Sequence, residues 1–133
     1  MPYGNHPELP VFVGEMPLDV HAPGCYTSQA EMKRYNRRNE QLADAAERSA
    51  VTADWMGAVP YPKEALNDAW KRFLWHQFHD DLTGTSIWEA YTYSWNDEFL
   101  AQGQFCDVIL ASAGAAASVM DTRAKGSPVL VYN

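Results

Sequence analysis

The longest periodic stretch of the sequence is SIWEAYTYSWNDEFLAQGQFCDVILASAGAAASVMD, residues 86–121. Apolar residues recur in it at spacings built from threes and fours, which is the period of one face of an α-helix. These residues are Ile87, Tyr91, Trp95, Phe99, Phe105, Ile109, Ala116 and Met120. Ser86 followed by Glu89 matches a capping box, which predicts the helix start. We therefore predict one long helix, although Gly103 and Gly114 weaken it by up to about 1 kcal/mol each.

Two further helices are predicted upstream of this stretch. Ser28 followed by Glu31 is a second capping-box pattern and predicts the start of the first helix. Its apolar stripe consists of Met32, Tyr35, Leu42, Ala46, Ala53 and Met56. Gly57 and the prolines that follow end this helix. A second helix is predicted from residue 63 to about residue 80, so the fold class is mainly α, a three-helix bundle.

Short apolar runs near both ends of the chain predict strands. LPVFV occupies residues 9–13 and is followed by a loop, and PVLVY occupies residues 128–132. Neither run has a sequence neighbour with which it could pair, and unpaired strand edges promote aggregation. We therefore expect the chain to be part of a larger protein.

Composition excludes several classes of partner. The net charge of −7 argues against a nucleic-acid partner, because phosphate binding depends on Lys and Arg. The one basic cluster is interpreted as solvated helix surface and consists of Lys33, Arg34, Arg37 and Arg38. No apolar run approaches 18 residues and the N-terminus does not resemble a signal peptide. We expect a soluble protein without a membrane partner; the sequence leaves its compartment open and favours the cytoplasm over export.

Chemistry-bearing residues concentrate in residues 75–85, WHQFHDDLTGT, at the predicted end of the second helix. Imidazole and carboxylate groups suit zinc, and His76 and His79 could supply two ligands from one helix. A zinc site nevertheless needs three or four ligands, and no other His or Cys cluster is near in the sequence. The alternative interpretation is structural: His76 is packed or on the surface, and Asp80 and Asp81 are exposed turn residues.

Aromatic residues near this segment have two possible roles. A helical stripe is interpreted as bundle core rather than as a sugar-stacking platform, and it consists of Trp70, Phe73, Tyr91, Trp95 and Phe99. Trp75 and Trp88 flank the segment and are the better candidates for reaching a pocket.

The run from His79 to Ser86, HDDLTGTS, resembles the helix-end motif of glycoside hydrolase family 38 α-mannosidases. Residues 14–38 resemble the entry of that family into its central three-helix domain, and residues 121–133 resemble the passage into its large C-terminal β-domain. The resemblance therefore covers essentially the whole chain, in family order. It implies the tail end of a catalytic α/β domain at 1–22, a three-helix middle domain at 23–121 and the start of a β-domain at 122–133.

The resemblance also implies site residues and a cofactor. By it, His79 is a ligand of one zinc ion whose other ligands lie in the absent N-terminal domain, and His76 is not a ligand. Asp80 is implied to bind the sugar hydroxyls of an α-mannoside substrate. The family retains anomeric configuration, which requires a nucleophile and an acid/base carboxyl group. The nucleophile is implied to lie outside this chain, and Asp19 is nominated as the acid/base, although Asp stands there where Glu is frequent.

We therefore expect part of a zinc-dependent retaining α-mannosidase, inactive without the remaining domains of the parent enzyme. The competing hypothesis is a non-catalytic helical bundle that acts as an interaction or oligomerisation module, including a homo-oligomer. The unpaired strand segments favour this alternative, because strand addition between copies would cover them.

Overall fold

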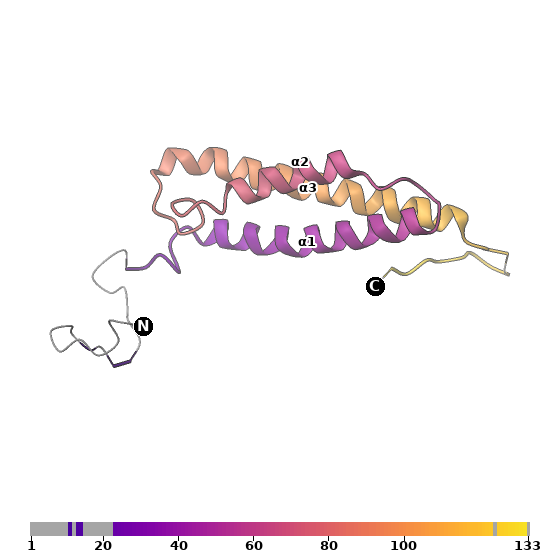
Figure 1. The fold of residues 1–133 in the computed structure, drawn as a ribbon, viewed down its shortest axis with the longest axis horizontal. Helices are drawn as coiled ribbons and strands as arrows, with labels where there is room; N and C mark the ends of the chain where they lie inside the picture. Colours follow the sequence, from indigo (N-terminus) through magenta and orange to yellow (C-terminus); the bar gives the residue numbers. More distant parts are fainter. Residues whose placement is uncertain (1–10, 12, 15–22, 124, 133) are drawn as a thin grey trace, which may run out of the picture.

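The computed structural model describes residues 11, 13–14, 23–123 and 125–132. These residues form three helices, α1 (Ala30–Trp55), α2 (Lys63–Trp75) and α3 (Trp88–Val119). In the elongated bundle, α1 and α3 run in the same direction and α2 runs in the opposite one (Figure 1). The predicted mainly α, three-helix bundle is confirmed. None of these described helices combines the length and the apolar character that crossing a membrane requires.

The core lies where the three helices meet. The part of it contributed by α1 is made of small residues, Ala43, Ala46 and Ala50. Small side chains allow neighbouring helices to approach closely, and larger rings from α2 and α3 fill the remaining space. Phe73 and Phe105 pack edge to face with ring centroids 6.5 Å apart. Trp70 covers them, and its indole Nε1 donates to Oε1 of Glu47 on α1 at 2.8 Å.

The two predicted capping boxes are wrong. α1 and α3 each begin two residues after the predicted serine, and neither has a side-chain hydrogen bond at its N-cap. The hydroxyl of Ser28 donates instead to the carbonyl of Gly84 at 3.0 Å. The hydroxyl of Ser86 donates to Oδ1 of Asp81 at 3.1 Å. Both serines therefore stabilise the segment between α2 and α3 rather than a helix end.

The predicted second helix is too long. It ends at Trp75, and the following amide of His76 bonds back to the carbonyl of Phe73 at 3.2 Å, the tighter spacing of a turn. Residues 76–84 continue as turns. Side chains of this segment bond to the neighbouring helices, Gln77 to Asn36 of α1 at 3.1 Å and His76 to Asp97 of α3 at 3.2 Å.

The aromatic stripe is only partly core, which corrects the prediction. Phe73 and Tyr91 are buried, but Trp95 is 40% and Phe99 is 63% exposed. The helix α3 is apolar on more than one face, and only one face can contact α1 and α2. The outer face of α3 therefore carries large apolar side chains that the described residues leave exposed.

The strand expected at residues 128–132 is not confirmed, because these residues are extended but pair with no other strand in the described part. They run back beside the end of α1 (Figure 1), where the hydroxyls of Tyr132 and Thr52 lie 3.5 Å apart. The strand expected at residues 9–13 lies mostly outside the described residues. The division into three domain segments stays a prediction.

Candidate functional site

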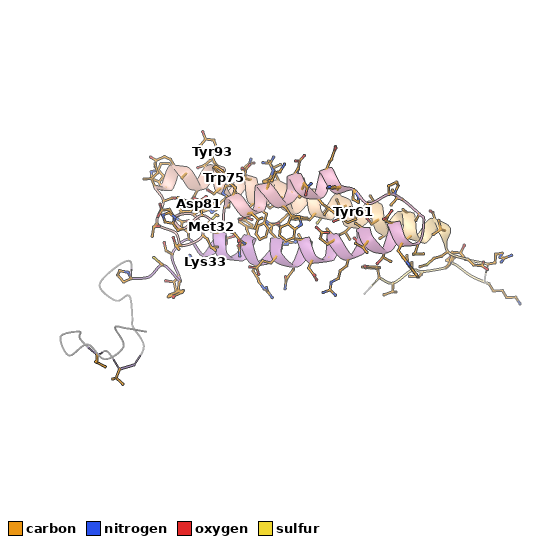
Figure 2. All side chains as sticks on the ribbon, in the orientation of Figure 1. Met32, Lys33, Tyr61, Trp75, Asp81 and Tyr93 are labelled. Atoms are coloured by element: carbon orange, nitrogen blue, oxygen red, sulfur yellow. The ribbon has the colours of Figure 1, made fainter. Side chains whose placement is uncertain are left out.

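Residues 76–87, which we call the connecting loop, join the end of α2 to the start of α3. They lie at the end of the bundle where α1 begins (Figure 1). His76, His79, Asp80 and Asp81 all belong to this loop. The side chains gathered at this end include those of Lys33 and Asp81 (Figure 2).

His79 and Asp80 lie side by side on the outside of the connecting loop. The side chain of His79 is 78% exposed and that of Asp80 is 46% exposed. Nε2 of His79 lies 3.7 Å from Oδ2 of Asp80. Oδ1 of Asp80 accepts a hydrogen bond from Thr85 Oγ1 at 2.7 Å, which orients the carboxylate. The imidazole and one carboxylate oxygen therefore stay accessible to a ligand from outside the bundle.

His76 is buried and its ring has no free nitrogen. Nδ1 lies 2.9 Å from Oδ2 of Asp81, and Nε2 lies 3.2 Å from Oδ2 of Asp97 on α3. Asp97 also accepts from Arg72 Nη1 of α2 at 2.6 Å. His76 therefore ties the loop to α3, as in the structural interpretation, and the possibility of two ligands from one helix is wrong.

Asp81 is mostly buried rather than an exposed turn residue. Besides His76, its carboxylate accepts hydrogen bonds from the hydroxyls of Ser86 and Ser94, each at 3.1 Å. A buried carboxylate needs such partners, because removing its charge from water is otherwise unfavourable. These contacts account for a charged residue at this position beside the candidate ligands.

Two further residues hold the loop and were not singled out as site residues from the sequence. The hydroxyl of Tyr91 donates to the carbonyl of Asp80 at 3.0 Å and accepts from the amide of Ser86 at 3.1 Å. Lys33 is partly buried against the loop, which corrects its assignment to the solvated basic cluster. The Lys33 contact joins residues 49 positions apart, whereas the Tyr91 contacts lie within 11 positions, and helical spacing carries no signal for either.

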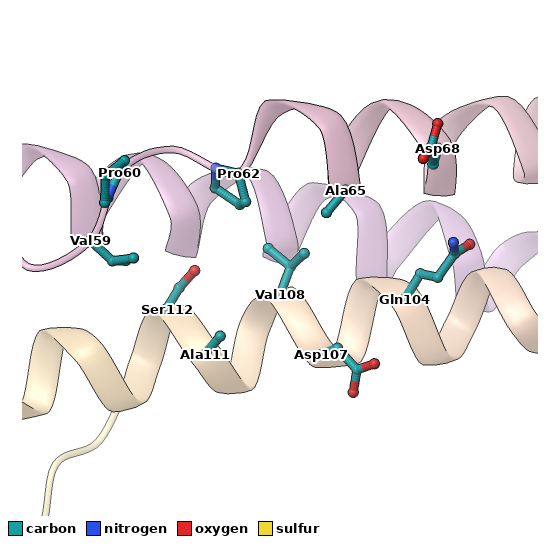
Figure 3. Close-up of a pocket in the computed structure, with 10 residues that line it drawn as sticks. All are labelled: Val59, Pro60, Pro62, Ala65, Asp68, Gln104, Asp107, Val108, Ala111 and Ser112. Carbon is teal, nitrogen blue, oxygen red and sulfur yellow. The ribbon is translucent and has the colours of Figure 1, made fainter.

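The aromatic residues that flank the loop are exposed. Trp75 is 76% and Trp88 is 73% exposed. Within the loop, the ring of Phe78 lies tilted against that of His79, with ring centroids 4.2 Å apart. A groove of about 330 Å³ lies elsewhere, where Val59, Pro60 and Pro62 face α3 (Figure 3). It is near the start of α2, whereas the loop follows the end of α2, so this groove is separate from His79.

A complete metal site is absent from the described part of the chain. No three His, Cys, Asp or Glu side chains among those residues come together as a metal-binding group. His79 and Asp80 have the donor chemistry that zinc accepts, but they supply at most two of the three or four protein ligands it needs. They fit a partial set that other residues must complete. Asp19 lies outside the described residues.

Comparison with known proteins points to α-mannosidases. The sequence model of the family described as "Alpha mannosidase middle domain" matches residues 21–115. The alpha-mannosidase of Saccharomyces cerevisiae is 37% identical over 91 residues, which are 65% of this chain and 8% of that protein. Alpha-mannosidase 2C1 of Mus musculus is 37% identical and that of Homo sapiens 36% identical, each over 60% of this chain and 8% of the relative. No solved structure matches the chain.

Proposed function

Because the chain belongs to the alpha mannosidase middle domain family, we propose that it works as part of a zinc-dependent, retaining α-mannosidase. His79 would be one zinc ligand and Asp80 would bind hydroxyls of a terminal α-mannoside. The chain spans 8% of the length of the curated relatives named above, so the other catalytic parts would come from the rest of the parent polypeptide.

The observation that carries this proposal is the exposure of His79 beside Asp80. Imidazole side chains with no ligand to bind usually lie packed or hydrogen-bonded, as His76 does, or are freely solvated. His79 is exposed and stands beside the carboxylate of Asp80, on a loop whose backbone accepts a part-buried hydrogen bond from Tyr91. Sites built on rigidly held loops are typical of ligand binding.

The two side chains suit recognition of mannose. Mannose presents cis hydroxyls at C2 and C3, and bound zinc would coordinate such a pair and orient the sugar ring. Asp80 keeps an accessible carboxylate oxygen, since Thr85 occupies the other one. That oxygen can accept a charge-assisted hydrogen bond from a neighbouring hydroxyl.

Asp19 is proposed as the acid/base carboxyl group. Retaining hydrolysis places this group about 5 to 5.5 Å from a nucleophilic carboxylate, which we place elsewhere in the parent enzyme. The 133-residue chain alone would then be inactive, because it would lack the nucleophile and most zinc ligands.

The test is made in the full-length polypeptide that contains this chain. His79→Ala should remove zinc content and hydrolysis of a chromogenic α-mannoside together. Asp80→Asn should keep the zinc and lower kcat/KM. Asp68→Asn, an exposed carboxylate on α2, serves as the matched control and should change neither. Activity and zinc content that survive His79→Ala would reject the proposal.

A second candidate function is an interaction or oligomerisation module, including a homo-oligomer. It is favoured by the outer face of α3, where Trp88, Phe99 and Leu110 are 73%, 63% and 70% exposed. Large contiguous apolar patches mark interfaces, so the module requires these side chains to form one patch. Size measurement separates the two candidates: a stable symmetric oligomer of the chain would favour the module, whereas association only with an α/β glycosidase domain would favour the enzyme.

A further inference from the structure

The side chain of Lys33, in the first turns of α1, reaches across to the connecting loop. Its Nζ donates to the carbonyls of Leu82 at 2.9 Å and of Thr83 at 3.2 Å, and also to the carbonyl of Ser28. An ammonium group has three donors, and all three are used here. The first two bonds join residues 49 and 50 positions apart in the sequence.

This arrangement differs from that of the neighbouring basic residues. Arg34 and Arg37 are exposed and pair with glutamates one helical turn away on α1. Lysine normally extends its ammonium group into water, and burial of the Lys33 group lowers its pKa from the ordinary value. Charge-assisted bonds to carbonyls compensate for this lost hydration.

The bonds of Lys33 continue to His79 through the loop. The Thr83 residue whose carbonyl Lys33 binds also donates its hydroxyl to the carbonyl of His79. Next to it, Ser28 donates to the carbonyl of Gly84 at 3.0 Å. The start of α1 therefore holds residues 82–84, and residue 83 in turn holds the backbone from which the His79 ring extends.

We propose that Lys33 is a positioning residue of the candidate site, which fixes the place of His79 and Asp80 by binding the backbone of the connecting loop. It touches neither the metal nor the sugar. This inference rests on the proposed function for its consequence, whereas its structural part, the ordering of the loop, does not.

The first experiment measures amide hydrogen exchange in the full 133-residue chain. Lys33→Met removes the donors and keeps much of the stem, Lys33→Arg keeps a charged donor, and Lys71→Met is the control because Lys71 is 79% exposed on α2. In Lys33→Met we expect exchange at residues 79–86 to become at least about tenfold faster, with helix cores unchanged. Lys33→Arg should keep more of the protection, and the control should match the parent sequence.

The second experiment measures zinc content, kcat and KM of the full-length polypeptide carrying the same variants. Lys33→Met should weaken zinc retention about tenfold or more at an unchanged Tm, and Lys33→Arg should restore part of it. Unchanged loop exchange, exchange raised equally in all three helices, or normal zinc retention despite a mobile loop would each overturn the inference. If His79→Ala leaves the zinc content intact, the proposed function fails. The exchange experiment still tests the ordering of the loop by Lys33 on its own.

Discussion

The carboxyl group of Glu98 on α3 lies against the side-chain amide of Asn39 on α1, and both residues are 0% exposed. Nδ2 of Asn39 donates to Oε2 of Glu98 and, at 3.0 Å, to its backbone carbonyl. The other two oxygens, Asn39 Oδ1 and Glu98 Oε1, have no hydrogen-bond partner among the described residues. Protonation gives the carboxyl group of Glu98 one O–H donor, and Asn39 Oδ1 is a buried acceptor that lacks a partner among the described residues.

We predict that the chain loses stability as the pH rises toward neutrality. Burial is the main cause that raises the pKa of Glu98 to about 7, and the nearby charges of Asp81 and Asp97 raise this pKa too. The hydrogen bond from Asn39 and the nearby His76 act in the opposite direction and lower it. Between about pH 4.5 and pH 7 the folded state therefore keeps this proton, whereas the unfolded state, in which the pKa is near 4.5, has released it. The stabilisation that this proton gives to the folded state is complete below about pH 4.5 and is lost as the pH rises through about 7. It amounts to about 3 kcal/mol of the free energy of unfolding.

The measurement is urea unfolding between pH 4.5 and 8.5. Glu98→Gln cannot ionise, and its amide can both donate to and accept from Asn39, so it should flatten the profile and be more stable than the parent sequence at pH 8. Asp107→Asn, an exposed change on the same helix, should leave the slope unchanged. Equal slopes for Glu98→Gln and the parent sequence would contradict the assignment.

This polar pair illustrates what the sequence could and could not predict about the fold. Apolar residues at threes and fours predicted all three helices, because burial of one helix face sets that period. Glu98 lies on a helix where a charged residue normally indicates solvent, and nothing local indicates that Asn39 faces it. The serines at 28 and 86 satisfied a local capping rule, yet their hydroxyls bond to the connecting loop.

The residues of the candidate site, too, could be predicted from the sequence only in part. His79 and Asp80 were identified from a contiguous motif, and the family assignment on which they rest is confirmed. Their roles stay predictions. Lys33 was missed as a loop anchor because its contact depends on where α1 packs against the loop. Tyr91 was assigned only to the core stripe, because helical spacing does not indicate that its hydroxyl bonds the preceding loop.

The two histidines of the loop should differ sharply in their effect on stability. His76→Ala removes the buried link between Asp81 and Asp97 and leaves Asp81 with fewer partners, so it should lower the free energy of unfolding by about 3 kcal/mol. His79→Ala changes an exposed ring and should stay within about 0.5 kcal/mol of the parent sequence. Urea unfolding at pH 7 measures both, and similar losses for the two variants would contradict the division into anchor and ligand.

Gly84 should tolerate no side chain, for two separable reasons. Its φ is +86°, and a Cβ built there would lie 2.7 Å from Oγ and 2.8 Å from Cβ of Ser28. Gly57 has a similar φ of +68° with nothing within 4 Å of an added Cβ, so Gly57→Ala reports the conformational effect alone. We expect Gly84→Ala to lose about 2 kcal/mol and Gly57→Ala about 1 kcal/mol. Ser28→Gly in the Gly84→Ala background should recover part of the difference; no recovery would place the loss elsewhere.

Zinc binding by the 133-residue chain should be weak, although the proposed parent enzyme holds the metal firmly. One accessible imidazole with one carboxylate leaves a tetrahedral shell half filled by water, and the described residues bring no third ligand nearby. His76 cannot be recruited without breaking its contacts to Asp81 and Asp97, which keeps it from completing the shell. Titration calorimetry at pH 7 should give a dissociation constant of about 0.1 mM or weaker. A tight, stoichiometric site that disappears in His76→Ala would mean that the buried histidine is the ligand, and the arrangement proposed around His79 would have to be abandoned.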